Sequence, residues 1–233
     1  HFMVARFLPI TGAIDTTYGT NGYYYIPFTI IPGSTRAGDT SNSTIIQPDG
    51  KMIVGGSSTN AGGDARFGLA RFTAQGELDD TFGSSNNGTT YIATSINGAD
   101  DNVIMALCLQ PDGKIIAAGY EGGGNHFAVA RFNSDGSLDA TFGTGGTAFI
   151  AAYIGGWGDD TANAVGLQSD GKIILAGRTR ITGSGNTRFA VARFNINGTL
   201  DTTFGGAGTG YTYVNPGIGT GADDTCRALT IQS

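Results

Sequence analysis

The hydrophobic positions of the chain follow one phrase that recurs along its length. In its clearest copy, Phe127–Phe132, large side chains (Phe127, Val129) alternate with mostly small ones (Ala128, Ala130). A period of two is typical of a β-strand, and apolar residues on both faces predict that both faces are covered. Every copy carries an arginine at its fifth position: Arg6, Arg71, Arg131 and Arg193. These arginines lie about 60 residues apart, and a fixed period of this length indicates a repeat architecture.

The middle repeat predicts four short strands. An apolar run at 105–109 leads into the sequence 110–114, where proline, aspartate and glycine favour a tight turn. The run 115–119 is apolar throughout, which indicates a strand buried on both faces. The recurring phrase at 127–132 supplies the third strand, and 147–150 supplies the fourth.

Four antiparallel strands in a unit of about 60 residues predict an all-β chain built from β-propeller blades. A right-handed β-solenoid is the competing repeat fold. It ranks lower because its coils are usually shorter and lack Asp-Gly hairpin turns every few residues.

The repeat divides the chain, which we take as one β-propeller region over 1–233, into three full and two partial units. These units cover about 1–38, 39–98, 99–157, 158–221 and 222–233. The first unit begins at a third strand, and the last stops after a first strand at Arg227–Ile231. Joining the two ends would leave one blade without its central second strand. The sequence therefore predicts part of a larger propeller, in a longer protein with further repeats or domains.

Three linked motifs carry a resemblance to a known family. They are Leu109–Ile115, Phe127–Phe132 and Asp135–Gly143, the last of which contains Leu-Asp-Ala-Thr-Phe-Gly. In this fixed order, and in copies that cover nearly the whole chain, they resemble the delta-60 repeat family of bacterial proteins. The resemblance implies a β-propeller, usually within large secreted or cell-surface proteins that often carry adhesin-like modules. It implies no established catalytic activity, cofactor or ligand.

Composition narrows the classes of partner. The net charge is −6, and the three lysines (Lys51, Lys114, Lys172) share one position of the repeat. No basic patch is left to neutralise phosphates, so we expect no nucleic-acid partner. No apolar run approaches the length of a membrane helix, so we expect no membrane span. Cys108 and Cys226 fall at different repeat positions, which favours neither a disulfide framework nor a thiolate metal site.

Pairs of carboxylates precede three of the first strands: Asp100, Asp101, Asp159, Asp160, Asp223 and Asp224. Clusters of oxygen ligands can bind Ca²⁺. The alternative is turn capping, in which an aspartate accepts hydrogen bonds from backbone N–H groups. No Asp-x-Asn-x-Asp-Gly loop accompanies the pairs, which favours capping. We therefore expect no metal and no cofactor, with structural Ca²⁺ as the weaker hypothesis.

Neither histidine predicts catalysis. His1 and His126 directly precede the signature phenylalanine, where the other copies carry Arg66 and Arg188. A position that accepts either histidine or arginine is predicted to be solvated rather than to bind a ligand. No Ser-His-Asp or Cys-His arrangement then remains, so we expect no catalytic residue.

An arginine and an aspartate recur across the same hairpin in each repeat. Arg131 ends the third strand, and Asp139 lies beyond the turn that follows. The full set of pairs is Arg6/Asp15, Arg71/Asp79, Arg131/Asp139 and Arg193/Asp201. We predict a salt bridge or an arginine-to-backbone clamp within each blade, and a structural role because every copy keeps it.

The repetition of every polar signature residue favours a non-enzymatic structural or interaction module over a unique active site. Carbohydrate binding near Tyr120 or Trp157 is the first alternative, because aromatic rings contact sugars. An enzyme with its site at the central funnel ranks below these two hypotheses, because the sequence contains no cluster of acidic and basic residues outside the repeated positions. We expect a protein or glycan partner at the variable loops Ser57–Arg66, Tyr120–His126 and Arg178–Arg188.

Overall fold

The computed structural model of this chain describes most of its 233 residues. The described segments are 2–26, 30–31, 38–83, 87–93, 96, 101–122, 126–149, 154, 156, 158–183, 185–206, 208–214 and 223–232. All regular elements in these segments are β-strands. None of the described segments forms a helix with the length and apolarity that a membrane crossing requires.

The strands form three four-stranded blades and one two-stranded sheet. The N-terminal sheet pairs β1 (Met3–Ala5) with β2 (Tyr23–Tyr25). The first blade comprises β3 (Thr40–Ile46), β4 (Met52–Thr59), β5 (Ala65–Phe72) and β6 (Thr89–Tyr91). The second comprises β7 (Val103–Leu109), β8 (Ile115–Glu121), β9 (His126–Phe132) and β10 (Thr147–Phe149). The third comprises β11 (Thr161–Leu167), β12 (Ile173–Arg180), β13 (Thr187–Phe194) and β14 (Tyr211–Tyr213).

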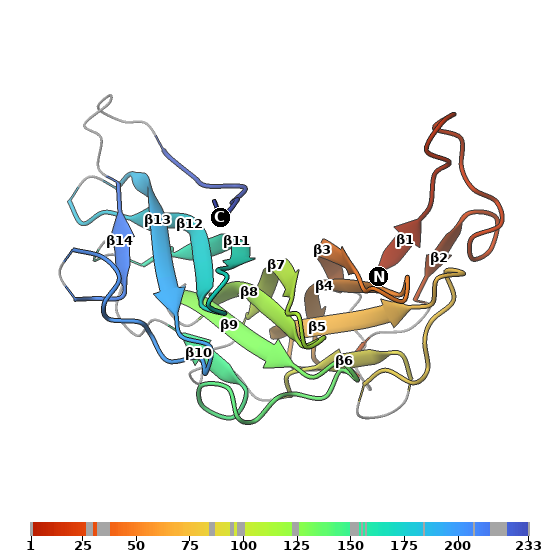
Figure 1. Ribbon diagram of the computed structural model, residues 1–233, viewed down its shortest axis with the longest axis horizontal. Helices are drawn as coiled ribbons and strands as arrows, with labels where there is room; N and C mark the ends of the chain where they lie inside the picture. Colours follow the sequence, from red (N-terminus) through yellow and green to blue (C-terminus); the bar gives the residue numbers. More distant parts are fainter. Residues whose placement is uncertain are drawn as a thin grey trace.

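Each blade is an antiparallel meander whose strands neighbour one another in chain order. The sheets follow one another around an open arc, with β3, β7 and β11 on its inner side (Figure 1). Strand β7 contacts both β3 and β11, so the first strands of neighbouring blades lie next to each other. The predicted all-β propeller with four-stranded blades is confirmed.

The alternation of the signature strand separates two hydrophobic cores. On one face of β9, Ala128 and Ala130 pack against the first blade in a cluster that includes Phe67. On the other face, Phe127 and Val129 pack against the third blade. All these side chains are fully buried. A large face of one blade therefore meets a mostly small face of the next, as the sequence pattern predicted.

A β-bulge occurs at the same place in every first strand. It leaves Asn42, Met105 and Asn163 as the extra residues of β3, β7 and β11. Two of them bond to the chain beside them: Asn42 Nδ2 donates to the Ile104 carbonyl of β7 at 2.8 Å, and Asn163 Nδ2 to the Cys226 carbonyl of the C-terminal segment at 2.9 Å. The bulge thus directs one side chain of each blade toward its neighbour, a common use of this irregularity.

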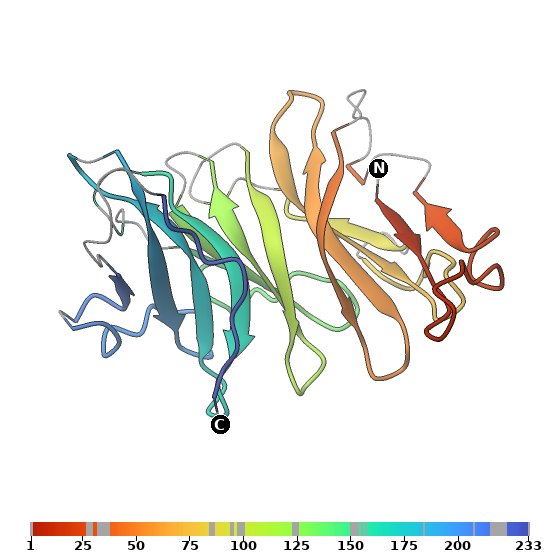
Figure 2. The same cartoon turned by 90° about the horizontal axis from the view of Figure 1, so that it is seen from above.

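The C-terminal segment differs from its prediction. The sequence indicates a first strand at Arg227–Ile231, but residues 223–232 form no ladder. Instead the segment runs along the third blade (Figure 2), where Asp224 N donates to the Thr187 carbonyl and Cys226 N to the Gly177 carbonyl. A strand is defined by its ladder, and the described residues offer this segment no second strand to pair with.

The turn after each third strand approaches the preceding sheet very closely. Gly136 has a φ of +87°, and a Cβ there would lie 2.7 Å from the ring of Phe82 in the first blade. Gly76 and Gly198 meet Tyr18 and Phe142 in the same way. Glycine at this position therefore serves both the turn and the contact between blades.

We expect Gly136→Ala to lower the free energy of unfolding by more than the roughly 1–3 kcal/mol of backbone strain, because Phe82 is fully buried and meets the added methyl group. Gly145→Ala is the matched control, since Gly145 has a φ of +61° and no atom within 4 Å of the added Cβ. Urea unfolding of both variants measures the difference. Equal losses in the two variants would show that the contact between blades contributes nothing.

Candidate functional site

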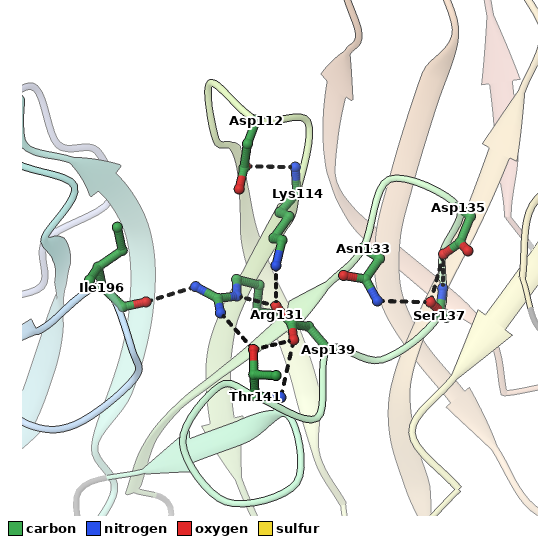
Figure 3. A network of polar contacts seen from close by, with 9 residues as sticks. All are labelled: Asp112, Lys114, Arg131, Asn133, Asp135, Ser137, Asp139, Thr141 and Ile196. Carbon is green, nitrogen blue, oxygen red and sulfur yellow. Dashed lines mark hydrogen bonds and ion pairs between the residues drawn. The ribbon is translucent and has the colours of Figure 1, made fainter.

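The arginine and aspartate of each repeat meet in a polar cluster, which Figure 3 shows for the second blade. Arg131 Nε donates to Asp139 Oδ2 at 2.7 Å, and Lys114 Nζ donates to the same oxygen at 2.7 Å. The backbone N–H and hydroxyl of Thr141 donate to Asp139 Oδ1 at 3.1 and 2.6 Å. Both carboxylate oxygens are therefore occupied. We call this cluster of Arg131, Lys114, Asp139 and Thr141, and its equivalents, the latch.

The latch also joins one blade to the next. Arg131 Nη1 donates to the carbonyl of Ile196 in the turn of the third blade at 2.7 Å (Figure 3). The guanidinium lies over the ring of Phe142, 4.8 Å from its centroid. The bonds from Arg71 to the Ser134 carbonyl (2.7 Å) and from Arg6 to the Ala74 carbonyl (3.1 Å) repeat this arrangement.

The sequence predicts an arginine clamp within each blade. The ion pair does lie within the blade, but the bond from the arginine to the neighbouring blade was missed. A guanidinium carries five donors, so one arginine can serve both partners. The lysine that recurs at a single repeat position was a signal for a larger cluster, and in the second blade Lys114 shares Asp139 with Arg131.

Burial differs along the series of latches. The side chains of Arg71 and Arg131 are 8% and 9% exposed, whereas Arg6 of the N-terminal sheet is 43% exposed. Arg193 of the third blade, 19% exposed, donates to the side chain of Gln168 at 3.5 Å. The two inner latches are therefore the desolvated ones, where losing a partner is costly.

The latch controls the ionisation of its aspartates. Burial alone would raise the pKa of Asp139, but hydrogen bonds from Lys114 and Thr141 and the charge of Arg131 outweigh it. The pKa of Asp139 is consequently held well below its usual range, and the same balance applies to Asp79. Both carboxylates are ionised at neutral pH.

The aspartate pairs before the first strands contact backbone and arginine groups. Asp101 Oδ1 accepts from the N–H of Ala65 at 3.1 Å, and Asp223 Oδ1 from the N–H of Thr187 at 2.7 Å. In both cases the aspartate caps a residue of the preceding blade. Asp224 lies 3.8 Å from Arg188, while Asp100 lies outside the described residues. Within the described segments, no three side chains of the metal-ligating kind converge on one point.

Asp160 occupies a buried position between the second and third blades. It accepts hydrogen bonds from the Thr179 hydroxyl and from the N–H of Ile154, the latter at 2.8 Å. Burial raises the pKa of this carboxyl to about 6, against the opposing effect of these hydrogen bonds and of His126. Asp160 is thus a buried acceptor that joins Ile154 to Thr179 of β12.

The position before the signature phenylalanine was predicted to be solvated, and this prediction is wrong. Arg66, His126 and Arg188 are all buried, between 7% and 8% exposed. His126 Nδ1 contacts Glu121 Oε1, and Glu121 is completely buried. The buried side chains of His126 and Arg66 form ion pairs with acidic residues of their own blades, Glu121 and Asp64. A comparison of the repeats in sequence does not show this burial, because it gives the residue types at a position and not what packs around them.

Tyr120, one of the two predicted ligand residues, lines a pocket of about 360 Å³. The pocket is also lined by Met105, Asp159, Thr161, Asn163, Arg178, Thr225 and Arg227. Burial raises the pKa of the Tyr120 hydroxyl, and the negative charge of Asp101 adds to this effect. The phenol is therefore a neutral hydrogen-bonding group at physiological pH. Trp157, the other predicted residue, lies outside the described residues.

A larger pocket of about 880 Å³ lies at the opposite end of β8. It is bounded by the turns Gln110–Asp112 and Gln168–Gly171, together with Ile196 and Ile231. These turns have equivalents in every blade, so the space results from blade stacking. The combination of Tyr120, Arg178 and Arg227 around the smaller pocket occurs once.

The fold and the latch define the chain as a β-propeller repeat protein. Three segments, residues 47–82, 110–142 and 168–204, match the family described as "Domain of unknown function (DUF5122) beta-propeller". Each match runs from the first turn of a blade to the phenylalanine of its latch, so the matched segment recurs once in each of the three blades. The resemblance to a β-propeller repeat family is thereby confirmed. A search of curated proteins found no match.

We expect Arg131→Leu to lower the free energy of unfolding by about 3 kcal/mol, because it leaves a buried carboxylate with fewer partners and removes the bond to the third blade. Arg6→Leu is the matched control. It breaks the same pair where the arginine is 43% exposed, so the expected loss is below about 1 kcal/mol. Chemical unfolding of both variants tests this, and an unchanged unfolding midpoint for Arg131→Leu would contradict the role of the latch.

Stability should fall in acid. Because the pKa values of Asp79 and Asp139 are lower in the folded chain than in the unfolded one, their contribution is complete above about pH 4. It is lost as the pH falls toward the folded pKa values. Melting temperatures measured from about pH 7 to 2 should show this decline, and Asp139→Asn should make the curve shallower. A decline of the same steepness in the variant would refute the assignment.

Proposed function

We propose that the chain is a non-enzymatic structural or interaction module of a secreted or cell-surface bacterial protein. The observation that carries the proposal is the use of the repeated polar residues. In every sheet the recurrent arginine and aspartate bond to each other, and three of the four arginines also bond to the next blade. Repeated residues thus build the frame. The location is supported by the family resemblance drawn from the sequence.

The frame holds variable side chains at fixed positions. The residue after the last glycine of the second strand is Ser57 in the first blade, Tyr120 in the second and Arg178 in the third. Loops that follow these positions join the second and third strands of each blade. Variable residues on a rigid scaffold are a common basis of recognition, so we place the partner surface here. We propose no cofactor for this module, since the aspartates before the first strands serve as caps and ion-pair partners.

Carbohydrate binding is the second candidate function. The observation that favours it is the pocket at Tyr120, where an aromatic ring stands beside hydroxyl, amide and charged groups. Sugar recognition uses this combination, because a ring covers the apolar face of the sugar and polar groups bond to its hydroxyls.

The proposed location can be tested in the source organism. Antibodies raised against the purified chain should label intact cells or detect the protein in the culture medium. Brief treatment of intact cells with trypsin should remove any surface label, while a cytoplasmic marker protein stays intact. Labelling that appears only after the cells are lysed would overturn the proposal.

A further inference from the structure

The pocket at Tyr120 is built from positions that recur in the fold but carry different residues in each copy. Met105 and Asn163 are the bulged residues of their first strands, and Arg227 holds the equivalent place in the C-terminal segment. Tyr120 and Arg178 are likewise equivalent residues of the second strands. The pocket thus lies at equivalent positions of successive repeats, and the different side chains at these positions give it its own chemistry.

The charges of the pocket leave capacity for an anion. Two guanidinium groups and one carboxylate line it. Arg178 Nη2 lies 3.4 Å from Asp159 Oδ1, a longer contact than the 2.7–2.8 Å of the arginine–aspartate pairs in the latches, and it engages one of the five donors that a guanidinium carries. Arg227 is exposed and forms no ion pair with any described residue. The fork of a guanidinium matches a carboxylate, which it binds with two parallel hydrogen bonds.

The remaining groups match a polyhydroxylated ligand. Thr161, Thr225 and Asn163 offer hydroxyl and amide groups, Asp159 offers acceptor oxygens, and Tyr120 offers a ring. A volume of about 360 Å³ is in the range of small-molecule sites. Because Asp159 stands in the same wall, a ligand with a single negative charge is favoured over a doubly charged phosphate.

We infer that this pocket binds an acidic sugar, in which a carboxylate lies against Arg178 and Arg227 and the hydroxyls bond to Asp159 and the threonines. The inference rests on carbohydrate binding, the second candidate function proposed above. It adds the chemical class of the ligand and the residues that select it.

The test is calorimetric or NMR titration of the purified chain with D-glucuronate, alongside D-glucose and inorganic phosphate. We expect saturable binding of glucuronate, at least about tenfold tighter than glucose, because the charged hydrogen bonds are lost with the neutral sugar. Added NaCl should weaken the binding of glucuronate and leave that of glucose unchanged.

Arg178→Gln and Arg227→Gln should each weaken the binding of glucuronate by about tenfold. Arg6→Gln is the matched control, since it removes the same charge from the N-terminal sheet and should leave the affinity unchanged. Arg227 is exposed on a segment without ladder partners, so its replacement tests the site even if Arg178→Gln fails to fold.

Each outcome is decisive. Equal binding of glucose and glucuronate would overturn the acidic ligand but leave carbohydrate binding in place. Preferred binding of phosphate would overturn the sugar assignment. Absence of binding by all three, or unchanged affinity in both arginine variants, would remove the site, while the proposed location is decided separately by the labelling of cells.

Discussion

A carboxylate that leaves water must have its lone pairs satisfied, and this constraint organises the whole stack of blades. Asp139 is 5% exposed, and its two oxygens accept from an arginine, a lysine and a threonine of its own blade. Those contacts, together with a bond from Arg131 Nη2 to the Thr141 hydroxyl, hold the arginine in place, and its Nη1 donates to the Ile196 carbonyl of the next blade. The satisfaction of one buried charge thereby sets the spacing of two sheets. The phenylalanine under the guanidinium and the glycine of the facing turn complete the same contact.

The rigidity of this frame explains how its inner surface can vary. The latches and the turn glycines lie toward the turns after the third strands, away from the bulged residues of the first strands. The bulged position carries asparagine in the first and third blades and methionine in the second, so the inner surface differs from blade to blade while the latch contacts stay the same. The residues of one pocket can differ from those at the equivalent positions because the latches, which join the blades elsewhere, are built from repeated residues.

Periodicity gave the strands, their alternation and the arginine–aspartate pairs, because these depend on neighbours in sequence and on residues that every copy keeps. The strands of the second blade and the packing of Phe127 against one neighbour and Ala128 against the other follow from the pattern alone. The pattern did not predict the burial of His126, which lies beside the fully buried Glu121. It also gave a strand at the C-terminal segment, where a sequence pattern cannot supply the missing ladder.

The sequence by itself thus determined the repeat, the four-stranded blade and the arginine–aspartate pair of the latch, because every repeat keeps the same residues and forms the same local structure. Only the tertiary structure decided to which backbone carbonyl each arginine donates, and which non-repeated residues of successive repeats line one pocket. Arg131 and Ile196 come from successive repeats, and so do Tyr120 and Arg178. Their contact depends on the stacking of sheets about 60 residues apart in sequence, a distance over which a local pattern carries no information about proximity. The pocket is the clearest case, because its residues differ at equivalent positions and become a site only when the blades stand side by side.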